Sequence, residues 1–158
     1  MDSIRIFGYK SFKKLSVQLH PINLLIGANG AGKSNFLSLF EMLGNIYEKR
    51  LGAYVAQVGG VDKLLYQGRK VTDRIAVSLL IAKSEYDLAL LESDGKLIVE
   101  REVVGCYDDG CPLDLVRKNV ITEYQSESSL KDHKEEDLSN YISQIRKFHF
   151  HDTGRRSP

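Results

Sequence analysis

The residues with the clearest chemical meaning lie in one short stretch, Gly27 to Ser34, which reads G-A-N-G-A-G-K-S. Its spacing fits G-x-x-x-x-G-K-[ST], the pattern of a phosphate-binding loop. Glycines remove side chains from a tight loop and permit positive φ, so that successive backbone N–H groups can point inward at an anion. The helix expected after the loop offers its N-terminal N–H groups and positive dipole end to the same phosphates. The stretch therefore predicts binding of a nucleotide polyphosphate.

Two side chains at the end of this loop have separate expected roles. Lys33 reaches the β- and γ-phosphates, and Ser34 places its hydroxyl on a bound Mg²⁺. With ordinary residue frequencies, the bare pattern arises by chance in about one chain of this length in two hundred. One alternative is a glycine-rich turn that only packs a strand against a helix. Another is a degenerate loop that no longer binds nucleotide, although none of the key residues is missing.

The segments on either side of the loop match what the motif requires. Residues 22–27, I-N-L-L-I-G, form a continuous apolar run, which is typical of a strand buried on both faces. After the loop, apolar residues recur at three- and four-residue steps from Phe36 to Tyr47, which predicts an amphipathic helix. Gly44 weakens that helix locally.

The first third of the chain contains further elements. Residues 3–8 and 13–19 alternate as two strands, with a turn over residues 9–12. A short helix is expected over residues 50–58, and residues 61–70 favour a helical turn and a loop.

From residue 72 the hydrophobic period changes to two. Residues 73–82, 86–92 and 96–104 are predicted to form three successive strands, and Asp94-Gly95 is a strong hairpin signal. The pattern indicates an antiparallel meander.

The last third of the chain is less regular. Residues 114–124 favour neither helix nor strand, and residues 125–137 are polar and expected to be exposed. Helical spacing returns over residues 137–147, and residues 148–152, F-H-F-H-D, alternate as one more strand.

Composition limits the class of protein. The chain has 158 residues, of which 42% are hydrophobic and 27% charged, as is typical of a globular protein. Its net charge of +1 gives no argument for or against nucleic acid. It shows no signal-peptide layout and no apolar run of the roughly 20 residues that span a bilayer. A cytoplasmic protein that does not associate with a membrane is therefore expected. Cys106 and Cys111 are expected to be free thiols at a loop.

The wider stretch L-L-I-G-A-N-G-A-G-K-S-N, with Asn29 inside the loop and Asn35 after it, resembles the ABC-type ATPase heads of the RecF, SMC and OLD proteins. Residues 4–27 are similar to their opening hairpin, which leads straight into the loop. V-G-G-V-D-K-L-L-Y-Q-G followed by strands, and F-H-F-H-D-T near the end, resemble one subgroup, the RecF-like ATPases often labelled AAA family.

This resemblance implies an α/β P-loop NTPase fold with an ABC-type lobe I, binding ATP with Mg²⁺ held by Ser34. Lys10, in G-Y-K-S-F, matches a place where relatives often carry an arginine that touches the nucleotide; the alternative is a solvated turn lysine. Lysine lacks the bidentate fork of that arginine. The implied nucleotide-binding residues are Lys10, Gly27, Ala28, Asn29, Gly30, Ala31, Gly32, Lys33, Ser34 and Asn35.

One N-terminal ATPase lobe is expected over residues 1–158, without a complete C-terminal lobe. Its expected parts are an opening hairpin, loop and helix over 1–48, a meander over 72–119, a polar exposed segment over 120–137, and a helix and strand over 138–152. The resemblance also implies head-to-head dimers or a C-terminal half in the parent protein, which would act in DNA repair, DNA maintenance or phage defence. DNA enters as a partner only through this resemblance.

A working ATPase of this kind needs an acidic residue after a later apolar strand, a water-orienting carboxylate and a signature segment similar to L-S-G-G-Q. Glu92 follows an apolar run, but the next residues suit a hairpin. Asp152 ends F-H-F-H-D, where His149 and His151 indicate a half-exposed strand or, less simply, a metal site. No catalytic residue is identified, and hydrolysis by this chain alone is not expected.

Two other functions are compatible with the loop. The first is a self-sufficient small P-loop kinase or NTPase, which would need a parallel sheet. The second is an interaction module, in which another chain carries the missing half and completes a split head.

Overall fold

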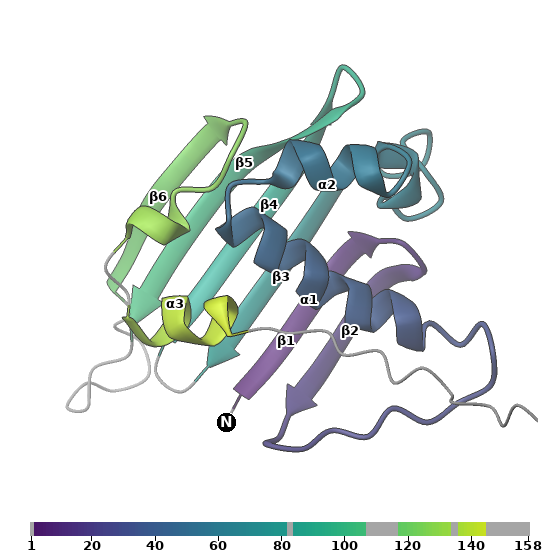
Figure 1. The fold of residues 1–158 in the computed structure, drawn as a ribbon, viewed down its shortest axis with the longest axis horizontal. Coiled ribbons are helices and arrows are strands. Elements are labelled where there is room, and N and C mark those ends of the chain that lie inside the picture. The colour runs from purple at the N-terminus through teal and green to yellow at the C-terminus, as the bar shows by residue number, and fades with distance from the viewer. Residues whose placement is uncertain (1, 82–83, 107–116, 134–135, 145–158) are drawn as a thin grey trace, which may run out of the picture.

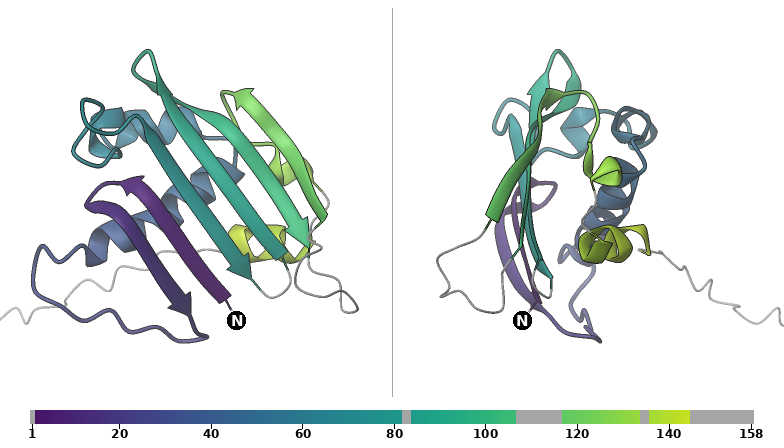
Figure 2. Two further views of the ribbon diagram at one scale, coloured as in Figure 1. Left: turned by 180° about the vertical axis from the view of Figure 1, so that it is seen from behind. Right: turned by 90° about the vertical axis from the view of Figure 1, so that its left-hand side faces the viewer.

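The computed structural model describes residues 2–81, 84–106, 117–133 and 136–144, which form two layers. One layer is a sheet, and the helices all lie on one of its faces (Figures 1 and 2). The strands are β1 (Asp2–Tyr9), β2 (Phe12–Leu19), β3 (Arg74–Ile81), β4 (Ser84–Ser93), β5 (Lys96–Cys106) and β6 (Arg117–Gln125). The helices are α1 (Lys33–Tyr47), α2 (Leu51–Gln57), η1 (Val61–Lys63), η2 (Leu130–Asp132) and α3 (Glu136–Ser143).

The sheet is antiparallel at every pairing in the described part of the chain. Its six strands lie in the order β2-β1-β3-β4-β5-β6. β1 therefore pairs with β3, although β2, α1, α2 and η1 lie between them in the sequence. The expected meander is confirmed in β3, β4 and β5. Asp94 and Gly95 have φ of 50° and 79°, as a two-residue hairpin turn with positive φ at both positions requires.

The core forms where the inward side of this sheet meets the apolar face of α1. Alternate residues of β3, from Ile75 to Ile81, are buried on the helix side, as their period of two predicts. The helical spacing predicted for residues 36–47 is also confirmed. The buried apolar residues of α1 are Phe36, Leu39, Met42, Leu43 and Ile46.

The prediction of a buried strand over residues 22–27 is wrong for this structure. This segment forms no strand, and Ile22, Leu24 and Ile26 are 89%, 81% and 84% exposed. Asn23 instead makes a local turn, in which its side chain accepts from the His20 N–H and donates to the His20 carbonyl. A central strand needs partners on both edges, and among the described residues none pairs with this segment.

The polar segment expected to be exposed after the meander is exposed only in part. Residues 117–125 form β6, and beyond it Ser128 and Leu130 are 2% and 1% exposed. The reason lies in Glu102 of β5, which is fully buried and faces the helices. A β-bulge separates Glu102 from the preceding inward residues of β5, so its inward position is not visible in a simple alternation.

The Glu102 carboxylate accepts four hydrogen bonds. Tyr86 and Ser128 donate their hydroxyls to one oxygen at 2.5 and 2.6 Å. The Thr122 hydroxyl and the Ser129 N–H donate to the other at 2.8 and 3.0 Å. Burial raises the pKa of the Tyr86 hydroxyl, and the nearby Glu102 charge raises it further, so Tyr86 stays protonated and donates.

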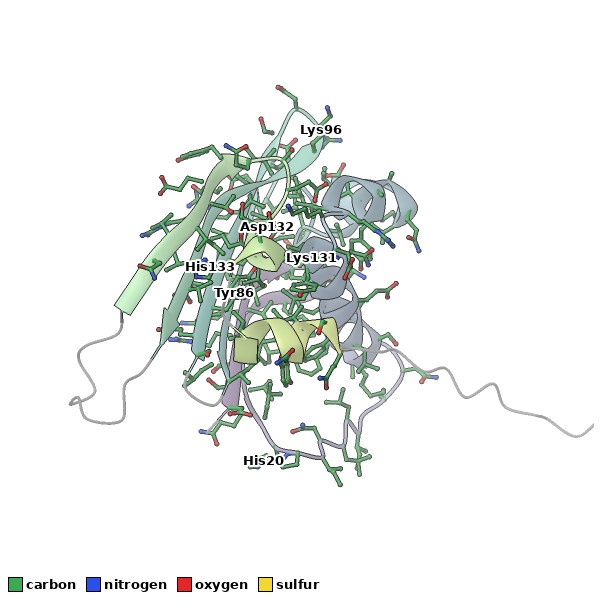
Figure 3. The ribbon with its side chains drawn as sticks, turned by 60° about the vertical axis from the view of Figure 1, so that its left-hand side comes forward. His20, Tyr86, Lys96, Lys131, Asp132 and His133 are labelled. Atoms are coloured by element: carbon green, nitrogen blue, oxygen red, sulfur yellow. The ribbon has the colours of Figure 1, made fainter. Side chains whose placement is uncertain are left out.

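Residues 126–132, called the strap here, connect this carboxylate to the helical layer. Glu127 caps α2, accepting from the Leu51 N–H at 3.0 Å. Lys131 pairs with Glu48 at 2.6 Å, and Asp132 pairs with Lys49, both just beyond the end of α1. Figure 3 shows Tyr86 close to the turn that carries Lys131 and Asp132.

Several predictions fall outside the described residues, among them Cys111 and the residues 148–152 with His149, His151 and Asp152. Within the described part of the chain, no three His, Cys, Asp or Glu residues are grouped as metal ligands would be. In that same part, the helices are too short or too polar to cross a bilayer.

We predict that Glu102→Ala lowers the free energy of unfolding by about 3 kcal/mol or more, because it leaves several buried hydrogen-bond donors without an acceptor. The measurement is urea unfolding followed by circular dichroism. Glu123→Ala, which removes an exposed carboxylate of the neighbouring strand, should stay within about 0.5 kcal/mol of wild type. Equal effects of the two substitutions would contradict the structural role given to Glu102.

Candidate functional site

The loop from Gly27 to Ser34 ends directly on a helix, as the motif requires. Gly30 and Gly32 have φ of 85° and 94°, which lie in the left-handed region open to glycine. α1 begins at Lys33, and the Phe36 N–H makes the first helical bond, to the Gly32 carbonyl at 2.9 Å. The backbone N–H groups before Phe36 therefore precede the first helical bond and suit an anion.

Lys33 lies folded over its own loop. Its ammonium donates to the carbonyls of Gly27 and Ala28 at 2.6 and 2.7 Å. The first turn of α1 carries no acidic residue, so no carboxylate there competes with an anion for this cation.

The turn between β1 and β2 supports the loop from one side. A Cβ on Gly32 would lie 3.2 Å from the Phe12 ring and 3.2 Å from the Ser11 hydroxyl. Asn35, in the first turn of α1, donates its amide to that same hydroxyl at 2.9 Å. Gly32 is thus required both by its backbone conformation and by the close approach of this turn.

Lys10 lies in the same turn and points at α1. Its ammonium donates to the Ser38 hydroxyl at 2.7 Å, and its backbone N–H donates to the Leu64 carbonyl at 2.7 Å. Lys10 is partly buried, which differs from the fully solvated turn lysine that the sequence left open.

Lys10 and Asn35 form one wall of a hollow of about 950 Å³. The opposite wall is formed by η1 and the segment after it, which contribute mostly polar and basic side chains. These are Asp62, Lys63, Gln67, Arg69 and Lys70. The hollow therefore lies between the β1–β2 turn, the start of α1 and residues 62–70, beside the predicted phosphate loop.

One ion pair fixes the shape of that opposite wall. Asp62 accepts from the Arg69 backbone N–H at 2.9 Å and from its guanidinium at 3.0–3.3 Å. The backbone hydrogen bond and then the side-chain hydrogen bonds from Arg69 lower the pKa of the Asp62 carboxyl. Asp62 is thus an ionised anchor for the loop, and its charge offsets part of the positive lining.

A second, apolar groove of about 270 Å³ lies on the other side of the start of α1. It separates the inward face of β2 from the extended segment before the loop. Its main apolar lining is Phe12, Leu15, Val17, Leu24, Ile26 and Phe36.

The predicted site residues are brought together in part. The loop residues from Gly27 to Ala31, which include Asn29, are exposed, and so is Ser34. Lys10 contacts α1 through Ser38, and Asn35 contacts the β1–β2 turn through Ser11. Sequence reasoning missed Ser11 and Ser38. Their only signal was position, since each lies in a turn or helix already expected beside the loop.

Glu92 has a local role at the β4–β5 hairpin. Its carboxylate accepts from the Gly95 N–H at 2.8 Å, inside the turn that Asp94 and Gly95 form. This confirms the hairpin interpretation of the run that Glu92 ends.

Comparison with known families settles the broader class. The family model described as the AAA ATPase domain matches residues 1–152. The chain belongs to the AAA ATPase domain family. Searches among curated proteins and solved structures give no match. Membership of the AAA ATPase domain family supports nucleotide binding, typically with Mg²⁺, and agrees with the mixed fold and the glycine-rich loop.

Two glycines of this AAA ATPase domain offer a matched test. We predict that Gly32→Ala lowers the free energy of unfolding by about 1–2 kcal/mol, because the new Cβ meets Phe12 at positive φ. Gly44→Ala, inside α1 with open space around it, should raise it by about 0.5–1 kcal/mol. Denaturant unfolding measures both, and changes of the same sign would contradict the assigned geometry.

Proposed function

We propose that this chain binds ATP with Mg²⁺ through the loop from Gly27 to Ser34. The observation that carries the proposal is the loop itself, two glycines at positive φ leading into the N-terminus of a 15-residue helix. Lys33 supports it, since an ammonium held by two loop carbonyls can exchange them for phosphate oxygens.

The residues present fit this ligand. Apart from its two chain neighbours, Gly30 has no residue within 4 Å of the Cβ position it lacks, so its backbone remains open to a phosphate. The Ser34 hydroxyl is exposed at the start of α1 and would hold Mg²⁺, which neutralises phosphate charge when bound. Lys10 and Asn35, which line the hollow, and Asn29 within the loop are proposed to line the phosphate region.

Hydrolysis by this chain alone is not expected. Phosphoryl transfer depends on positioning and on charge stabilisation around the transferred group. Among the described residues, Glu92 is held by the β4–β5 turn. The nucleotide-holding part of a site is therefore proposed without the part that breaks the bond.

The finer family assignment is also part of the proposal. The chain resembles RecF, SMC and OLD heads, and on that resemblance its parent would act in DNA repair, DNA maintenance or phage defence. Head-to-head dimerisation and DNA contact rest on the same ground, while cytoplasmic localisation rests on the sequence pattern, in which no apolar run is long enough to span a bilayer. The antiparallel sheet of the described residues counts against a small kinase, which would need parallel strands.

One observation favours a second function, completion of this lobe by another chain. Ile22, Leu24 and Ile26 are more than 80% exposed, next to an apolar groove and to the outer edge of β2, which pairs with no further strand among the described residues. Soluble domains seldom leave adjoining large apolar side chains uncovered without an interaction to cover them. A strand-bearing partner, carrying the remainder of a split head, would cover both faces of this segment.

The nucleotide proposal is tested at Lys33. We predict that Lys33→Ala weakens ATP binding at least tenfold, which corresponds to about 1.4 kcal/mol, measured by calorimetry with Mg²⁺ present. Lys131→Ala removes the same charge near the far end of α1 and should bind ATP as wild type does. Equal affinity of Lys33→Ala and wild type would contradict binding at the loop, and strong turnover lost in Lys33→Ala would contradict the absence of hydrolysis.

The completion proposal is tested at the exposed segment. We predict that Leu24→Asn with Ile26→Asn changes the free energy of unfolding by less than about 0.5 kcal/mol, because both side chains are already in solvent. The same double variant should lose pairing with the polypeptide encoded by the neighbouring reading frame, measured after co-expression. Ile75→Asn, at a fully buried position, should by contrast cost several-fold more stability.

Two outcomes would contradict the completion proposal. A double variant that unfolds as readily as Ile75→Asn would show that the segment is buried within this chain. Retained pairing would place the partner elsewhere on the lobe.

A further inference from the structure

The hydroxyl of Ser38 lies where three segments meet. Ser38 is on α1, one turn beyond Asn35, and is only 7% exposed. Its oxygen is 2.9 Å from the Tyr9 hydroxyl, 2.7 Å from the Lys10 ammonium and 2.8 Å from the Asn35 carbonyl. The Tyr54 hydroxyl of α2 also reaches the Ser38 carbonyl, at 3.3 Å.

The directions of these hydrogen bonds follow from chemistry. A carbonyl and an ammonium have fixed roles, so Ser38 donates its one proton to Asn35 and accepts from Lys10. Tyr9 must then donate to Ser38 as well. Burial raises the pKa of the Tyr9 hydroxyl, which keeps it protonated for this role. Ser38 thus makes one donation and two acceptances, the full capacity of a hydroxyl.

The backbone at Lys10 is also unusual. It has φ of 46° in a two-residue connection between β1 and β2, where glycine is the usual first residue. Residues other than glycine rarely adopt this backbone conformation, because it costs free energy. Residues that do adopt it cluster at ligand sites. The residue in this conformation, Lys10, lines the hollow and donates its ammonium to Ser38.

We propose that Ser38 is the positioning residue for Lys10, holding its ammonium beside the start of α1 so that it contributes to binding the nucleotide phosphates. The inference rests on the proposed function, since it assigns a role at the same site. A free lysine side chain loses up to about 2 kcal/mol of rotamer entropy when it is fixed. Fixing it beforehand on Ser38 removes part of that cost from the binding step.

A second hydrogen bond also joins the β1–β2 turn to α1. Asn35 donates to the Ser11 hydroxyl, so both residues of the β1–β2 turn are bonded to the first two turns of α1. The turn and the loop therefore keep a common geometry, because α1 is continuous with the loop through Gly32.

The test compares ATP affinity, measured by competition with a fluorescent ATP analogue, in a small set of variants of the 158-residue chain. Ser38→Ala should weaken ATP binding roughly three- to tenfold, and Lys10→Met should weaken it by a similar factor. The double variant should be no weaker than Lys10→Met alone, because Ser38 acts only through Lys10. Ser38→Thr, which keeps the hydroxyl, should return to within about twofold of wild type.

Tyr9→Phe separates positioning from stability. It removes a hydroxyl from the same cluster but leaves the Lys10–Ser38 bond, so the melting temperature should fall while ATP affinity stays within about twofold of wild type. Wild-type affinity in Ser38→Ala, or losses that multiply in the double variant, would overturn the role of Ser38. Wild-type ATP affinity in Lys33→Ala would instead contradict the proposed function, on which the role of Ser38 rests.

A readout that needs no nucleotide tests the contact itself. An ammonium bonded to Ser38 and partly buried should react slowly with acetic anhydride, so Ser38→Ala should raise the labelling rate of Lys10. Exposed Lys96, in the β4–β5 hairpin, serves as the internal reference in mass spectrometry (Figure 3). An unchanged ratio of Lys10 to Lys96 labelling would overturn the inference whatever the nucleotide result.

Discussion

The packing of α1 against the inward face of the sheet is the interaction on which the rest of this structure depends. The buried face of the helix, from Phe36 to Ile46, joins the inward residues of β1, β3 and β4 in one apolar core. Burial of each large apolar side chain contributes about 1.5–3 kcal/mol, far more than any single polar contact at the surface. Because α1 begins at the glycine-rich loop, the same packing fixes where the end of the loop can lie.

Both ends of α1 are then secured by polar contacts from distant parts of the sequence. At its start, the β1–β2 turn supplies Ser11 and Lys10 to Asn35 and Ser38. Near its other end, the strap supplies Lys131 to Glu48, and Glu127 caps the helix that follows. The strap is itself held by the buried Glu102, so a carboxylate inside the sheet indirectly restrains the helix that carries the loop.

Part of this could be predicted from the sequence because the signals are local. The period of two in β3 to β5, the Asp94-Gly95 turn and the helical spacing after Lys33 each depend on neighbours within a few residues. The inward position of Glu102 could not be predicted, because a bulge in β5 changes the phase of the alternation. The Lys10–Ser38 contact joins positions 28 residues apart, and it exists only once α1 is seated on the sheet.

The segment before the loop shows why the remaining prediction failed. The residues 22–27 have the composition of a central strand, but composition describes what a strand can bury and supplies no partner for its hydrogen bonds. In this chain the loop is therefore fixed on its exit side by α1 and the β1–β2 turn, while its entry runs through exposed residues. If nucleotide binding fixes this exposed entry, the cost of about 1–2 kcal/mol for ordering each backbone residue lowers the affinity. A strand that paired with the segment would fix the entry and raise nucleotide affinity. By linkage, the nucleotide would raise the affinity for that strand by the same factor.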